Sequence, residues 1–193
     1  MNYLGHLFFS NNDTELMLAN LFGDFVKGSD LSEYQPKTQE GIKLHRSIDS
    51  FIDTHPLVLD LLHDLYRQLP KVAGIAVDLY FDHLLAKNWQ KYHSKPLEDF
   101  LTEFYESIDL TSDQFSSAFK NMVHHLVKVN WISYYPTLDG LDKACRGVSS
   151  RVSFPNELKN GLTVFLEHEK KISTVFDAYM KAAMDYFNIG NSK

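Results

Sequence analysis

The sequence predicts an all-α protein, folded as a single-domain helical bundle of about seven to nine helices. Two observations predict this fold class. Apolar residues recur at helical spacing along most of the chain, and the sustained apolar/polar alternation typical of strands is absent. The length of 193 residues suits one domain spanning 1–193, because domains commonly contain roughly 100–200 residues. No repeat, low-complexity tract or linker divides the chain.

The N-terminal part of the chain is predicted to begin with a short apolar segment followed by two helices. Asp13 is a suitable N-cap for a helix over about 14–26, and Gly28 would end it. The polar stretch 29–38 is predicted to be a loop. The next helix covers about 38–53.

Proline residues mark the boundaries of the helices that follow. Pro56 suits the first turn of a helix over about 57–68, because its fixed φ fits that position and no N–H is needed there. A long helix is predicted over about 71–92, and Pro96 would open another.

The C-terminal half is predicted to contain three more helices, and the apolar residues of the last one recur at a 3.6-residue rhythm. Their approximate ranges are 111–132, 136–147 and 156–187. Thr111 or Ser112 would cap the first of them.

Composition and charge exclude several classes of protein. No run of about 18 apolar residues is present, so no membrane-spanning helix is predicted, and a secretory signal is also absent. The single cysteine, Cys145, excludes an internal disulfide and fits a reducing compartment. The formal net charge of −6 disfavours broad nucleic-acid binding. We therefore expect a cytoplasmic protein with neither a membrane nor a nucleic acid as partner.

Three predicted helices carry pairs of polar residues four positions apart, which places each pair on one helical face. These pairs are Asn20 and Asp24, His45 and Asp49, and Asp78 and Asp82. Buried carboxylates are costly unless they are ion-paired, hydrogen-bonded or bound to a metal. If the three helices turn these pairs inward, together with His6, they form a His/Asp/Asn site inside a bundle, where metal sites are commonly built.

Each polar pair also has a purely structural interpretation. A single pair of Asp residues at this spacing usually lies on a solvated face, and Arg46 could form an ion pair with Asp49 or Asp53.

A His/Asp site favours Mn, Fe, Mg or Zn, and it typically activates a water molecule and neutralises phosphate oxygens. Arg46 could then clamp a phosphate, and both roles can coexist.

Four segments resemble the bacterial acyl carrier protein phosphodiesterase family, namely 1–6, 19–28, 41–49 and 77–89. In the C-terminal half the resemblance rests on length, helical pattern and the setting of Arg151. It implies hydrolysis of the phosphodiester that joins 4′-phosphopantetheine to a serine of holo-acyl carrier protein. It also implies a divalent metal, with Mn as first choice and Mg, Fe or Zn as alternatives.

The resemblance further implies a distant, HD-like kinship to the all-α HD phosphohydrolases. The adjacent pair Asp82-His83 reverses the usual HD order, so the metal site is carried over without an exact ligand set. The predicted metal ligands are His45, Asp49, Asp78 and Asp82. The predicted catalytic groups are Asp24, His6, Arg46 and His83. The predicted substrate-binding groups are Arg46, Asn20 and Arg151.

Holo-acyl carrier protein is the partner that the resemblance implies. Because carrier proteins are acidic, as this chain is, binding would need a local basic rim. The candidates for it are Lys27, Lys43, Arg46, Lys87, Lys91 and Arg151.

Two alternative functions stay open. One is an HD-like phosphohydrolase that acts on a small nucleotide or other phosphodiester. The other is a non-enzymatic helical interaction protein whose polar pairs form only ion pairs.

Overall fold

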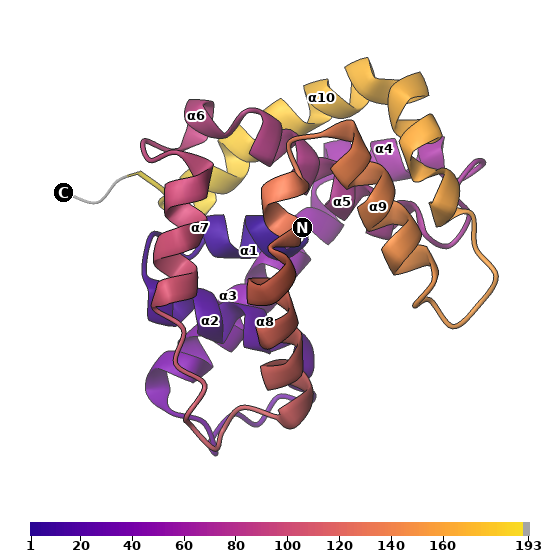
Figure 1. Ribbon diagram of the computed structural model, residues 1–193. Coiled ribbons are helices and arrows are strands. Elements are labelled where there is room, and N and C mark those ends of the chain that lie inside the picture. The colour runs from indigo at the N-terminus through magenta and orange to yellow at the C-terminus, as the bar shows by residue number, and fades with distance from the viewer. Residues whose placement is uncertain (191–193) are drawn as a thin grey trace.

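The computed structural model describes residues 1–190, which form ten α-helices and three 3-10 helices, with no strand in that range (Figure 1). The α-helices are α1 (Tyr3–Phe8), α2 (Thr14–Phe22), α3 (Pro36–Thr54), α4 (Pro56–Leu65), α5 (Ala73–Lys87), α6 (Trp89–Tyr92), α7 (Leu97–Glu106), α8 (Ser117–Val129), α9 (Leu138–Ser149) and α10 (Gly161–Tyr186). The 3-10 helices are η1 (Gly23–Phe25), η2 (Trp131–Tyr134) and η3 (Leu158–Asn160). The predicted all-α fold class is confirmed, and eight of the α-helices have at least seven residues. The last three residues of the predicted domain 1–193 lie outside the described ones.

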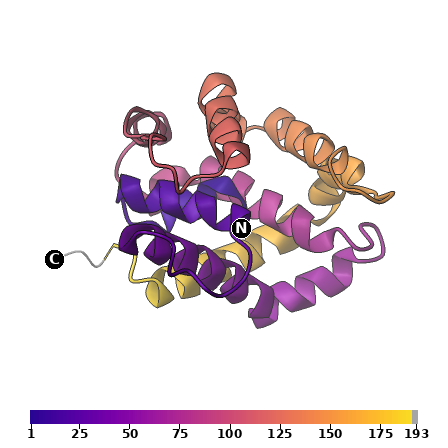
Figure 2. The ribbon, with the colours of Figure 1, turned by 90° about the horizontal axis from the view of Figure 1, so that it is seen from below.

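Helix α5 occupies the centre of the molecule. Its sequence is apolar on nearly every side, as expected for a helix that is buried all round. It packs against α1, α4, α9 and α10. Figure 2 shows α7, α8 and α9 along one side of the molecule, with the N-terminal helices beneath them.

Several predicted boundaries agree with the structure because the local capping signals were correct. The Asp13 side chain accepts a hydrogen bond from the Leu16 N–H and so caps α2. Pro56 is the first residue of α4. The predicted loop 29–38 is shorter than expected, because Pro36 already begins α3.

Two predictions on the following helices were wrong. The expected helix over 71–92 is divided at Asn88, whose side chain donates to the Leu84 carbonyl and separates α5 from α6. Ser116, rather than Thr111 or Ser112, caps α8 by accepting a hydrogen bond from the Phe119 N–H. That helix ends at Val129, because the next residue adopts the left-handed conformation.

The C-terminal helices also start later than predicted. Helix α9 begins at Leu138 and is capped by Thr137. The last helix begins at Gly161, after the short η3. The segment between α9 and η3 contains Arg151.

Helices α2 and α3 pack unusually closely, and this contact determines where the polar pairs lie. A Cβ atom on Gly41 would lie 2.4 Å from the Cβ of Ala19. Only a glycine at this position in α3 therefore permits the observed approach of the two helices. The close contact brings the Asn20/Asp24 pair next to the His45/Asp49 pair.

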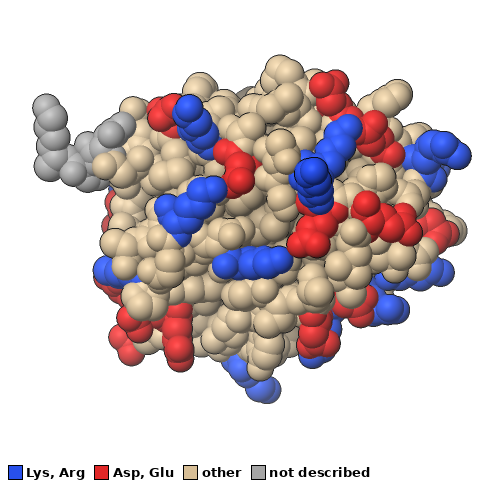
Figure 3. All heavy atoms as spheres, turned by 90° about the horizontal axis from the view of Figure 1, so that it is seen from above, with Lys and Arg blue, Asp and Glu red and all other residues tan. Residues whose placement is uncertain are grey.

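Positive and negative side chains are interspersed on the face shown in Figure 3. Two candidates for the predicted basic rim form ion pairs with α10, Lys87 with Glu169 at 3.3 Å and Lys91 with Asp177 at 2.7 Å. Among residues 1–190, none of the helices combines the length and apolarity needed to span a bilayer.

Candidate metal centre

The imidazoles of His6 and His45 stack face to face beside the carboxylate of Asp49. Their ring centroids are 4.1 Å apart, with an angle of 17° between the planes. Helix α1 supplies His6, and α3 supplies the other two residues one turn apart. One ligand atom of each side chain lies within 4.8 Å of the other two. Both histidines are buried, and Asp49 is partly exposed to the surrounding pocket.

Asn20 sets the orientation of His6. Its Nδ2 donates to the His6 carbonyl at 2.9 Å and to Ser10 Oγ at 3.0 Å, so its Oδ1 accepts from His6 Nδ1 at 2.9 Å. This arrangement leaves Nε2 of His6 directed at the Met1 carbonyl, at 3.0 Å, and at Asp49 Oδ1, at 3.3 Å. Burial lowers the pKa of His6. A neutral His6 therefore presents the lone pair of Nε2 to two oxygen acceptors.

His45 lies between two carboxylates. Its Nε2 is 3.3 Å from Asp24 Oδ1 and 3.2 Å from Asp49 Oδ2. Burial alone would lower the pKa of His45, but hydrogen bonds to Asp24 and Asp49 raise it to about 9. Burial alone would raise the pKa of Asp49, yet the hydrogen bond from His45 holds it well below its usual value. The hydrogen bond from His45 also lowers the pKa of Asp24.

The chemistry of these facing atoms fits a divalent cation. With Nε2 of both imidazoles unprotonated, the atoms that converge are all acceptors, and such a group is stable only around a proton or a metal ion. Two imidazole nitrogens and a carboxylate suit Mn, Fe or Zn. Binding a metal would require His45 to lose its proton. The group of His6, His45 and Asp49 could therefore hold a metal ion.

Gly23 makes room for His45. A Cβ atom at this position would lie 2.4 Å from Cγ of His45 and 2.5 Å from its Cβ. Asp24, the next residue of η1, lies with its Oδ1 3.3 Å from Nε2 of His45. Sequence reasoning did not assign a role to Gly23, although the glycine directly precedes a candidate acid.

Asp78 and Asp82, predicted as ligands, lie outside this group and hold the start of the chain in place. The Asp82 carboxylate is inaccessible to solvent and accepts hydrogen bonds from the N–H groups of Asn2, Leu4 and Gly5 at 2.7–3.2 Å. Burial raises the pKa of Asp82 to about 7. Asp78 pairs with the Met1 ammonium group at 2.8 Å. The two carboxylates thus position α1, which carries His6.

Arg46 and His83 also have partners elsewhere. The guanidinium of Arg46 donates to the carbonyls of Val26 and Gly28, at 3.3 and 2.7 Å, so it holds the segment after η1. His83 donates from Nδ1 to the Tyr135 carbonyl at 2.7 Å. Its ring is buried against Phe165. Both side chains therefore contribute hydrogen bonds to the fold, and the catalytic roles predicted for them stay predictions.

A polar pocket of about 450 Å³ opens over the candidate ligands. Asp24, Asp49 and Asp78 line it together with both histidines, and Arg151 from the linker after α9 contributes positive charge at its edge. The structure therefore brings together six predicted site residues from five separate parts of the chain. Those six are His6, Asp24, His45, Asp49, Asp78 and Arg151.

One known protein family matches the sequence over nearly its whole length. The sequence profile described as acyl carrier protein phosphodiesterase matches residues 1–183. The chain belongs to this family. The match includes all the candidate ligands and extends through most of α10.

Curated proteins named acyl carrier protein phosphodiesterase are similar to the chain over most of its length. The protein from Yersinia enterocolitica is 29% identical over 185 residues, covering 95% of this chain and 96% of that protein. The protein from Photorhabdus laumondii is 30% identical over 152 residues, covering 78% of this chain and 77% of that protein. No solved structure matches the chain, so the expected kinship to HD phosphohydrolases stays a prediction.

Proposed function

We propose that this chain hydrolyses the phosphodiester between 4′-phosphopantetheine and a serine of holo-acyl carrier protein, releasing the apo carrier. The observation that carries the proposal is the group of His6, His45 and Asp49 in an accessible pocket of a chain whose family match spans residues 1–183. Mn is the first choice of metal, with Mg, Fe or Zn as alternatives. The family is named for an activity on acyl carrier protein, and the donor set suits phosphodiester chemistry.

Different residues in and around the pocket would have different roles in such a site. A divalent ion bound there would neutralise phosphate oxygens and make a bound water more acidic. Asn20 holds the His6 ring so that Nε2 faces the pocket. Asp24, with a side chain 66% exposed, stays ionised beside His45 and can accept a proton from the attacking water. Arg151 lies at the pocket edge, where its charge can attract the phosphate.

The decisive experiment incubates the protein with holo-acyl carrier protein and Mn and follows the carrier by mass spectrometry. We expect the carrier to lose the mass of the 4′-phosphopantetheine arm. Asp49→Asn should lower the rate by at least about 100-fold, because it removes a charged ligand from the group. Asp60→Asn, an exposed carboxylate on α4, is the matched control and should retain the wild-type rate.

The same experiment separates this function from the two alternatives. Hydrolysis of bis(p-nitrophenyl) phosphate or a cyclic nucleotide, with holo-carrier left intact, would favour a small-molecule phosphohydrolase. An unchanged carrier mass with each common divalent ion, together with no turnover of the small esters, would favour a non-enzymatic interaction protein. Either result would contradict the proposed function.

A further inference from the structure

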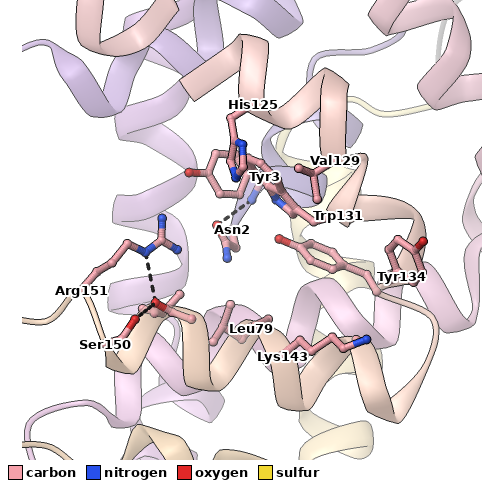
Figure 4. A pocket seen from close by; sticks show the side chains of 15 residues that line it. Asn2, Tyr3, Leu79, His125, Val129, Trp131, Tyr134, Lys143, Ser150 and Arg151 are labelled. Carbon is pink, nitrogen blue, oxygen red and sulfur yellow. Dashed lines mark hydrogen bonds between the residues drawn. The ribbon is translucent and has the colours of Figure 1, made fainter. Parts of the chain in front are cut away.

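A second cavity, of about 620 Å³, lies directly beside the metal pocket (Figure 4). One wall of the cavity is a single face of α9. Its lining residues are three or four positions apart, or adjacent, as expected for one helical face. They are Gly140, Lys143, Ala144, Gly147 and Val148. The other walls are aromatic and come from α1, η2 and the residue that follows η2. Their aromatic residues are Tyr3, Trp131, Tyr134 and Tyr135. We call this cavity the aromatic groove.

The aromatic groove and the metal pocket adjoin each other. Asn2, Tyr3, Val148 and Arg151 line both of them. Figure 4 shows the Arg151 guanidinium and the Tyr3 hydroxyl on the same side of the groove, with Tyr134 and Lys143 at the opposite side. A ligand whose phosphate lies at Arg151 can therefore extend away from the metal centre along the groove.

The volume and lining of the groove suit an elongated, mainly apolar group with a few polar atoms. Pockets for small ligands commonly measure roughly 300–1,000 Å³ and combine apolar and aromatic walls with a small number of polar groups. Here the polar groups are dispersed around apolar walls, and they include His125, Ser150 and the hydroxyl of Tyr134. A pantetheine arm has this character, because methyl and methylene groups separate its two amides.

We propose that the aromatic groove binds the pantetheine arm of the substrate, with the phosphate at Arg151 and the thiol end directed toward Tyr134 and Lys143. The inference rests on the proposed function, since that function determines what is attached to the scissile phosphate. It assigns recognition of the arm to α9, η2 and Tyr3, separately from the residues that hold the metal.

Two glycines supply a matched pair of variants for the test. Gly147 lies on the groove face of α9, and Gly74 lies in the first turn of α5 outside the groove. Both are exposed, and a Cβ atom at either position would meet nothing within 4 Å. Leucine favours helix more than glycine does, so both substitutions should fold. Gly147→Leu places a side chain in the groove, whereas Gly74→Leu does not.

The experiment measures binding of free pantetheine, which lacks the phosphate, by isothermal titration calorimetry. We expect Gly147→Leu to weaken binding at least about tenfold and Gly74→Leu to leave it unchanged. With holo-carrier as substrate, Gly147→Leu should raise KM more than it lowers kcat. Should Gly147→Leu fold poorly by circular dichroism, Val129→Trp in the groove and Val127→Trp outside it provide a second matched pair on α8.

The outcomes separate this inference from the proposed function. Equal pantetheine affinity in Gly147→Leu and Gly74→Leu would overturn the groove assignment, even if wild-type protein releases the arm from holo-carrier. Tighter binding of adenosine monophosphate than of pantetheine in the groove would overturn it too. Groove-dependent pantetheine binding without any release of the arm would support the groove and contradict the proposed hydrolysis.

Discussion

Asp82 and His83 are neighbours in sequence, and both side chains are almost inaccessible to water, yet they support different parts of the molecule. The Asp82 carboxylate satisfies backbone N–H groups at the start of α1, and the His83 imidazole donates to the Tyr135 carbonyl behind η2. Consecutive residues of a helix point about 100° apart, so their partners come from different segments. Each polar side chain provides a hydrogen-bond partner for backbone groups that would otherwise be buried without one.

The predicted consequence at His83 is a pH-dependent stability difference. We expect His83→Asn to lower the free energy of unfolding at pH 8 by about 0.5–3 kcal/mol, because the amide keeps a donor but loses ring packing on Phe165. Burial lowers the pKa of His83 in the native state, whereas the unfolded chain takes up a proton below about pH 6.5. The stability that the neutral imidazole contributes is therefore present above that pH and is lost as the pH falls.

The His83→Asn variant lacks this titrating group. The difference in the free energy of unfolding between the variant and wild type should therefore become smaller as the pH falls from 7 to 5. Urea unfolding of both proteins at several pH values measures the difference. A difference in the free energy of unfolding that stays constant or grows on acidification would contradict the assignment of a buried neutral imidazole to His83.

At the scale of elements, the contact of α2 and η1 with α3 creates the site. Gly41 permits the close approach of the helices, and Gly23 leaves room for the His45 ring at the point where α2 becomes η1. Both glycines act through the volume that they leave free, and neither has a positive φ. The approach of these elements brings Asp24 within 3.3 Å of His45 Nε2.

A methyl group at Gly23 tests this packing. We expect Gly23→Ala to reduce the free energy of unfolding by about 1–3 kcal/mol, because the added Cβ overlaps the His45 ring and forces a shift. The displaced imidazole should also weaken metal binding about 10- to 100-fold. Chemical denaturation and metal titration measure the two effects.

Gly74→Ala is the control for this substitution, because its Cβ meets nothing within 4 Å. It should leave metal binding unchanged and stabilise the helix by up to about 1 kcal/mol. Wild-type metal affinity in Gly23→Ala would show that His45 tolerates the methyl group, contrary to the packing observed.

At the scale of the whole molecule, the candidate ligands connect the first helix to the third. His6 belongs to α1, which α5 holds through Asp82, while His45 and Asp49 belong to α3. A ligand that binds the native arrangement and not the unfolded chain adds to stability by mass action. A metal at this site would therefore stabilise the packing of α1 against α3.

We expect Mn at about 100 times its dissociation constant to raise the free energy of unfolding by about 2.7 kcal/mol. Asp49→Asn should lose most of this gain, and Asp60→Asn should keep it, because only Asp49 belongs to the candidate ligand group. Thermal or urea unfolding with and without Mn measures the effect. An equal gain in all three proteins would place the metal elsewhere.

The sequence by itself determined the all-α fold class, the helical faces of the pairs in α3 and α5, and the nomination of His45, Asp49 and Asp24. These features depend on the 3.6-residue helical repeat, which is visible in one segment at a time. The predicted helix over 14–26 was too long, because α2 ends at Phe22 and Asp24 belongs to η1. The sequence prediction missed Ser116 as the N-cap of α8, because several nearby residues offered comparable caps.

Only the tertiary structure decided which polar groups share a site. Asp82 accepts hydrogen bonds from residues 77–80 positions away in sequence. His6 reaches His45 because α1 packs on α2, which in turn packs on α3. Spacing along a helix specifies the face on which a side chain lies, but its partner depends on which other element packs against that face. For this reason His6, which the sequence placed among the catalytic groups, joins His45 and Asp49 in the candidate ligand group, whereas Asp78 and Asp82 lie outside that group.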